Sequence, residues 1–116
     1  MQALDVLTAE DTKRTDLAGQ HAAPKASGRV YWSASQGLLF SAEDLPPLPQ
    51  GRIYQLWLVT KPAPVSAALV IPDGSGRYSV LAQSPRGVQP TAFALTIEPA
   101  GGVPAPTGAT YLLGAL

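Results

Sequence analysis

The sequence predicts an all-β fold, an antiparallel β-sandwich of about seven to eight short strands with immunoglobulin-like architecture. The first observation is alternation, because Phe93, Leu95 and Ile97 stand two residues apart, the spacing of a strand that buries one face. The second is the frequency of residues that break helices, since 11 Gly and 12 Pro separate short apolar runs and leave little room for long helices. Turn signals recur about every 8 to 12 residues, which is typical of sandwiches.

The N-terminal part is expected to differ from the rest of the chain. It opens with an alternating run, Leu4–Thr8, which we interpret as a first strand. The polar stretch Glu10–Ala18 follows, and we expect a loop there with one helical turn near Glu10–Arg14. The predicted organisation is therefore a loosely ordered N-terminal segment over residues 1–20 and a β-sandwich domain over residues 21–116.

Two hairpins are predicted in the sandwich domain. The tight connection Ser35-Gln36-Gly37 joins the first pair of strands, and Pro72-Asp73-Gly74-Ser75-Gly76 joins a later pair. Between them, Pro46-Pro47-Leu48-Pro49 favours extended, polyproline-like backbone. The strands expected in this domain span residues 29–34, 37–42, 52–60, 67–71, 77–82, 91–98 and 109–116, with a loop at 86–90.

The strongest predicted strand, Arg52–Thr60, is expected to be central because both of its faces carry apolar residues. Tyr54 and Leu56 lie on one face, and Gln55 and Trp57 lie on the other. The two aromatic rings therefore cannot stack on a single ligand, and at least one of them belongs to a core. We interpret Trp57 as a packing residue, because buried aromatic side chains dominate core energetics.

The strand at residues 91–98 runs into a corner, Glu98–Gly102, that excludes regular structure. Pro99 lacks an N–H group and favours extended backbone before it, whereas Gly101-Gly102 can adopt positive φ. We expect the Glu98 carboxylate to fix this corner by accepting N–H groups of the Gly101-Gly102 turn or by pairing with an arginine such as Arg52.

A catalytic acid or a ligand-binding carboxylate is the alternative role for Glu98. Acid–base hydrolysis usually needs a second carboxylate or a histidine, and the neighbouring sequence supplies neither. His21 is the only histidine and cysteine is absent, which argues against zinc sites and thiol nucleophiles. No Gly-x-Ser-x-Gly elbow accompanies His21. We therefore expect no catalytic residue, no metal site and no cofactor.

Charge and hydropathy exclude further classes of protein. The 8 basic and 8 acidic residues give a net charge of zero, without the clustered Lys and Arg that nucleic acid binding needs. No apolar run approaches the ~20 residues that span a bilayer, and residues 1–20 show no signal-peptide pattern.

Three motifs stand in a fixed order along the chain: Leu45–Val59, then Pro72–Gly76, then Ile97–Gly102 with Pro106–Gly108. In order and spacing they resemble the C-terminal domain of anti-sigma-K factor RskA proteins, and the resemblance covers Val30–Leu116. The residues that carry it read as architectural rather than chemical. They are Tyr54, Gln55, Leu56, Trp57, Asp73, Gly74, Gly76, Glu98, Pro99, Gly101, Gly102, Pro106, Thr107 and Gly108.

The resemblance, which is weaker over Leu4–Gly19, implies a bacterial regulator of which this chain is the extracytoplasmic part. In that family a cytoplasmic domain, absent from this chain, binds a sigma factor, and one transmembrane helix, also absent here, precedes the outer domain. Site-specific proteases then release the sigma factor. The implied role is sensing or shielding without catalysis, and a homodimer through an edge strand such as Ala109–Leu116 stays open.

A second class of function stays open beside the first. A secreted or surface β-sandwich could bind carbohydrate or a protein ligand if Tyr31, Tyr54 or Trp57 formed an exposed aromatic platform. The burial of Trp57 distinguishes the two hypotheses.

Overall fold

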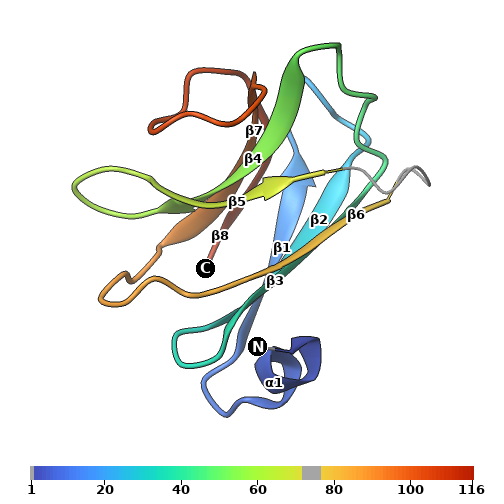
Figure 1. Cartoon of the computed structure of the whole chain (residues 1–116). Coiled ribbons are helices and arrows are strands. Elements are labelled where there is room, and N and C mark those ends of the chain that lie inside the picture. Colours follow the sequence, from blue (N-terminus) through green and yellow to red (C-terminus); the bar gives the residue numbers. More distant parts are fainter. Residues whose placement is uncertain (1, 72–76) are drawn as a thin grey trace.

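The computed structural model describes residues 2–71 and 77–116 and shows one antiparallel sheet with a short helix near its N-terminus (Figure 1). The turn predicted at Pro72–Gly76, with Asp73, Gly74 and Gly76, lies outside the described residues. The elements in chain order are α1 (Ala3–Thr8), β1 (Lys13–Gly19), β2 (Ser27–Ser33), β3 (Gly37–Glu43), β4 (Arg52–Val59), β5 (Val65–Val70), β6 (Arg77–Ala82), β7 (Ala92–Pro99) and β8 (Thr110–Ala115).

The eight strands form a single sheet in the order β5-β4-β7-β8-β1-β2-β3-β6. The sheet curls until strands that are distant in this order face each other across the interior (Figure 1). Trp32 of β2 lies against Phe93 of β7 with ring centroids 6.1 Å apart, and Tyr54 of β4 meets Tyr78 of β6 at 5.5 Å. The prediction of an all-β antiparallel fold is confirmed, and its opposing layers are parts of one nearly closed, barrel-like sheet.

The core lies inside this curl and follows from the period-two pattern of the strands. Leu56 and Leu58 of β4 and Phe93 and Leu95 of β7 point inward and are fully buried. Each such side chain contributes about 1.5–3 kcal/mol through its removal from water. Because β4 lies between β5 and β7, its predicted central position is confirmed.

The N-terminal run Leu4–Thr8 was expected to be a strand, and this expectation is wrong because the run lies within helix α1. Gln2 and Asp5 form a capping box that satisfies N–H groups at the start of the helix. Only Val6 of this helix is buried, whereas Leu4 is 68 % exposed. The alternation of Leu4, Val6 and Thr8 was therefore too short to indicate a strand with one buried face.

The loop expected over Glu10–Ala18 is also wrong, because β1 begins at Lys13. The helical turn expected near Glu10–Arg14 is also absent. A single turn, in which the Thr12 N–H donates to the Ala9 carbonyl, leads into β1 instead. Thr15 and Leu17 alternate inward, but charged residues on the outer face made the segment read as polar. β1 pairs with β2 on one side and with β8 on the other, so it lies in the interior of the sheet.

The remaining strands match the sequence prediction closely in extent, with two changes in pairing. The second predicted hairpin is wrong, because β5 pairs with β4 and β6 pairs with β3 rather than with each other. The Ser35–Gly37 hairpin is confirmed by antiparallel pairing of β2 with β3. β8 was expected to be available as an edge, and this is wrong because it lies between β7 and β1. The true edges are β5 and β6.

Candidate functional site

The strongest polar cluster lies on the outer face of β4 and β7, beneath the loop that connects β7 to β8. Glu98, near the end of β7, is fully buried. Its carboxylate accepts the backbone N–H groups of Thr107 and Gly108, each at 3.2 Å to Oε1, and the Thr107 hydroxyl at 2.6 Å. Residues nine and ten positions further along the chain therefore fold back onto this carboxylate.

A hydrogen-bonded relay reaches Glu98 from the neighbouring strand. Trp57 donates its indole N–H to the Thr96 hydroxyl at 2.8 Å, and Thr96 donates to Glu98 Oε2 at 2.5 Å. Burial raises the pKa of Glu98, but the bonds from Thr107, Thr96 and Gly108 outweigh it and hold that pKa below its ordinary value. The site thus stabilises an ionised carboxylate that the loop covers on the outer face of the sheet.

Gln55 holds the other end of the same loop. Its amide nitrogen donates to the Ser66 hydroxyl at 2.7 Å and to the Val103 carbonyl at 3.0 Å, while its amide oxygen accepts the Val103 N–H at 3.1 Å. Gln55 faces Thr96 across the β4–β7 pair. One side chain from each strand therefore holds the loop, Gln55 at Val103 and Glu98 at Thr107 and Gly108. We call these five residues the loop clasp.

The predicted role of Glu98 is confirmed in kind and corrected in detail. Glu98 is bonded to backbone N–H groups, as expected, but the donors are Thr107 and Gly108 rather than the Gly101-Gly102 turn or Arg52. Gly101 and Gly102 do adopt positive φ, at 92° and 82°.

The structure separates the other motif residues into two groups. Tyr54 and Leu56 point into the core, whereas Gln55 and Trp57 point outward and are nevertheless buried. Pro99 pairs with Arg52 at the end of the ladder, and Pro106 belongs to the exposed part of the loop. Sequence reasoning missed Thr96, Ser66 and Val103. Thr96 alone carried a signal, because it shares the outer face of β7 with Glu98 at period two.

No exposed aromatic platform is formed by the three rings considered. Trp57 and Tyr54 are 0 % exposed, so neither offers a face to a sugar, and Tyr31 is only half-buried on β2. Tyr54 donates its hydroxyl to the Pro46 carbonyl at 2.7 Å, and burial raises its pKa. The interpretation of Trp57 as a packing residue is confirmed.

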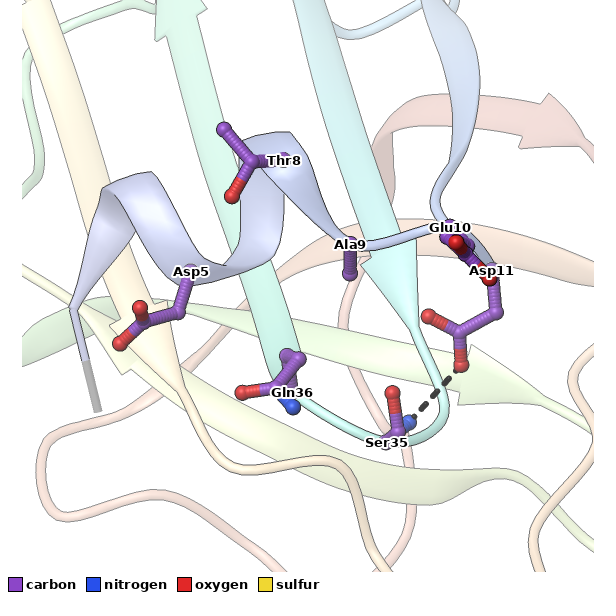
Figure 2. A pocket seen from close by; sticks show the side chains of 7 residues that line it. All are labelled: Asp5, Thr8, Ala9, Glu10, Asp11, Ser35 and Gln36. Carbon is purple, nitrogen blue, oxygen red and sulfur yellow. Dashed lines mark hydrogen bonds between the residues drawn. The ribbon is translucent and has the colours of Figure 1, made fainter.

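A second polar region is an acidic hollow of about 520 Å³ between α1 and the β2–β3 turn. Figure 2 shows Asp5 on the helix, Asp11 after it, and Ser35 and Gln36 on the turn, gathered around this hollow. The Asp11 carboxylate accepts the Ser33 hydroxyl at 2.5 Å and the Ser35 N–H at 3.1 Å, and the bond from Ser33 lowers its pKa. Asp11 thereby ties the N-terminal segment to the sheet.

Neither region has the residues of a metal site. Across residues 2–71 and 77–116, no three His, Cys, Asp or Glu side chains gather where they could hold an ion. In the same part of the chain, no helix has the length and apolar character needed to cross a membrane.

Comparisons with known proteins place the chain in a family. A family model described as anti-sigma-K factor rskA, C-terminal, matches residues 1–110. A Streptomyces griseus protein, called an uncharacterized protein in the phr 5' region, is 35 % identical over 103 residues, which cover 88 % of this chain and 41 % of that protein. The chain thus spans about two-fifths of this relative, and no solved structure matches. The chain belongs to the family of anti-sigma-K factor RskA C-terminal domains.

Proposed function

We propose that this chain is the extracytoplasmic regulatory domain of a membrane-bound anti-sigma factor and controls sigma-factor release through regulated proteolysis. It acts by shielding a cleavage site and performs no catalysis. The sigma factor would bind a cytoplasmic domain outside this chain, and a transmembrane helix would connect the two parts. Family membership supports this role, and the matched relative is long enough to hold such further parts.

The observation that carries the proposal is the position of β1. Residues Lys13–Gly19 pair with a strand on each side, so their backbone is already engaged in the sheet. A protease needs an accessible segment, and this one becomes accessible only when the sheet opens. Before it, α1 packs Val6 into the domain. The folded sheet therefore protects the N-terminal segment from cleavage.

The polar clusters support a structural role rather than catalysis. The buried carboxylate of Glu98 already accepts hydrogen bonds from Thr96, Thr107 and Gly108. Its depressed pKa keeps it ionised at neutral pH, which is the opposite of what a general acid requires.

Core destabilisation in the full-length protein tests the proposal. Leu56 is fully buried, and Leu56→Ala is expected to lower the free energy of unfolding by about 2–5 kcal/mol. Cleavage of a transiently open state follows the population of that state, so proteolysis and sigma-factor release should rise. Immunoblots of the intact protein, together with a sigma-dependent reporter, measure both quantities.

The matched control is Leu113→Ala, the same substitution at a side chain that is 41 % exposed on β8. It should leave stability and cleavage close to those of the unsubstituted protein. Unchanged cleavage of a Leu56→Ala protein whose outer domain is demonstrably unfolded would rule out shielding.

A further inference from the structure

The two ends of the curled sheet are closed to different degrees. Antiparallel pairing places the β1–β2, β3–β4 and β7–β8 connections at one end. The β2–β3, β4–β5 and β6–β7 connections lie at the other end, on the side of α1 (Figure 1). At the first end, connection residues Ala23, Ala26 and Leu45 are buried in the core. At the second end a hollow of about 300 Å³ remains.

The lining of this hollow is largely apolar. It consists chiefly of Lys13 of β1, Trp32 of β2, Ala34 just after β2, and Val88 and Pro90 of the β6–β7 connection, and we call it the end hollow. Trp32 belongs to the core and Val88 packs against it, so the apolar lining is continuous with the core. Small-molecule sites in proteins are concave, mostly apolar and about 300 Å³ or larger. The end hollow therefore fits a small ligand with an apolar body.

An unpaired cation stands at the rim of the end hollow. Lys13 lies directly opposite Trp32 in the β1–β2 ladder and is exposed. Within residues 2–71 and 77–116 it forms no ion pair. Asp11 also lines the hollow, but its two carboxylate oxygens already accept the Ser33 hydroxyl and the Ser35 N–H. The charge of Lys13 is therefore available to an anionic group of a ligand.

Further positive charge surrounds this end of the sheet. Thr60 donates to the carbonyl of Gln89, a lining residue of the end hollow, at 3.3 Å, so the β4–β5 connection lies beside it. Lys61 stands in that connection and Arg86 in the β6–β7 connection, and neither has an ion pair in the described part of the chain. Glu10 lies at the same end but lines the acidic hollow beside α1. The surroundings of the end hollow therefore favour an anion.

We propose that the end hollow binds a medium-chain aliphatic carboxylate. The carboxylate pairs with Lys13 at the rim, and the apolar chain lies against Trp32 and Val88. An aliphatic chain suits the hollow better than an aromatic ring, because Trp32 is only 5 % exposed and offers no open face for stacking. This inference goes beyond the proposed regulatory role and holds whether or not the domain shields a cleavage site.

Nuclear magnetic resonance titration of the ¹⁵N-labelled chain with octanoate and decanoate tests the inference. The sequence has two tryptophans, which give an internal comparison. Trp32 lines the end hollow, whereas Trp57 is buried on the outer face and bonded to Thr96. The Trp32 indole resonance should shift saturably and that of Trp57 should not. Decanoate should bind up to about tenfold more tightly than octanoate, because its longer chain removes more apolar surface from water.

A neutral analogue tests the role of Lys13. Octanol has the same chain length as octanoate without the charge, and it should bind about three- to fivefold more weakly, the contribution of one exposed ion pair. Lys13→Met should remove this difference between the two ligands. Lys25→Met, at an exposed lysine in the β1–β2 connection at the opposite end, should preserve it.

A filled hollow provides the second arm of the test. Ala34 is exposed and lines the end hollow, so Ala34→Trp should abolish the saturable shift at Trp32. Ala22→Trp, at an exposed position at the opposite end, should not. Circular dichroism confirms that each variant is folded. The inference is overturned if neither carboxylate gives a saturable shift at Trp32, or if Trp57 shifts equally. Binding that is unchanged by both Lys13→Met and Ala34→Trp would also overturn it.

Discussion

At the scale of single residues, Glu98 shows how an ionised group can be kept in a buried position. A carboxylate removed from water is costly unless its acceptor sites are filled. Here two hydroxyls and two backbone N–H groups supply the bonds, from Thr96, Thr107 and Gly108. The negative charge is thereby used to hold a loop against the sheet.

We expect Glu98→Gln to destabilise the domain by about 1–3 kcal/mol at pH 7, because an amide group replaces one acceptor with a donor that faces other donors. Urea unfolding followed by tryptophan fluorescence measures the change. Glu10→Gln, the same substitution at an exposed position, serves as the control. Equal stability of the two variants would contradict the idea that the loop clasp stabilises the domain.

The pH dependence of stability follows from the lowered pKa of Glu98. The unfolded state takes up a proton near the ordinary Glu pKa of about 4.3, whereas the folded state does so only at lower pH. The contribution of Glu98 is therefore complete above about pH 5 and is lost as the pH falls through the folded pKa. Urea midpoints measured from pH 7 to pH 3 should fall more steeply for the unsubstituted chain than for Glu98→Gln.

The sequence allowed part of this site to be predicted. An acid at the end of an apolar strand, before Pro and Gly, indicated a carboxylate bonded to backbone. The identity of the donors was not predictable from local rules, because Thr107 and Gly108 reach Glu98 only when the whole loop folds back. The N–H group of Gly102, which is closer to Glu98 in the sequence, instead donates to the Pro99 carbonyl at 3.0 Å.

At the scale of elements, the loop between β7 and β8 depends on close backbone contact. A Cβ atom added at Gly108 would lie 1.7 Å from the Ile97 carbonyl oxygen, so the loop has no room for a side chain there. We expect Gly108→Ala to displace the loop, break the bonds to Glu98 and lower the free energy of unfolding by about 2 kcal/mol or more. Hydrogen exchange at the Thr107 amide should rise in parallel.

Gly87→Ala is a suitable comparison for this variant. Gly87 has φ of 73° and open space around its Cα, so alanine there costs only the backbone strain of a left-handed conformation, about 1–2 kcal/mol. Its effect on hydrogen exchange should not reach Thr107. If both variants raised hydrogen exchange at the Thr107 amide equally, close packing at Gly108 would not be what holds the loop against the sheet.

Strand prediction succeeded where one face was clearly apolar and failed where the outer face was charged. β4 and β7 show the alternation plainly and were predicted almost to their observed bounds. β1 buries only Thr15 and Leu17. Its outer face carries Arg14 and Asp16, and Lys13 occupies an exposed position at the end of the inward face. Two buried positions in seven are too few for a local pattern, so pairing with β2 and β8 decides the structure there.

At the scale of the whole molecule, truncation should separate α1 from the sheet. Deleting residues 2–9 removes α1 and the buried Val6, which should cost stability but leave all eight strands. Deleting residues 2–19 removes β1 from the interior, so β2 and β8 each lose one of their two neighbouring strands. We expect the first variant to unfold cooperatively and the second to lose its cooperative transition.

Circular dichroism during heating measures both transitions. A sharp transition in the longer deletion would mean that β2 and β8 can pair without β1. The position of β1 would then no longer support protection of the N-terminal segment.

The pairing of β1 with β8 also determines the order in which the domain can form. Ala18 lies opposite Leu113, so the sheet joins residues from near the two ends of the chain. Contacts between residues so distant in sequence slow folding, because a long loop must close before they form. Among the eight strands, β1 comes first in the sequence and β8 comes last, so their pairing can form only after β8 has been made. Under the proposed shielding role, the N-terminal segment would gain its protection only when β8 has joined the sheet.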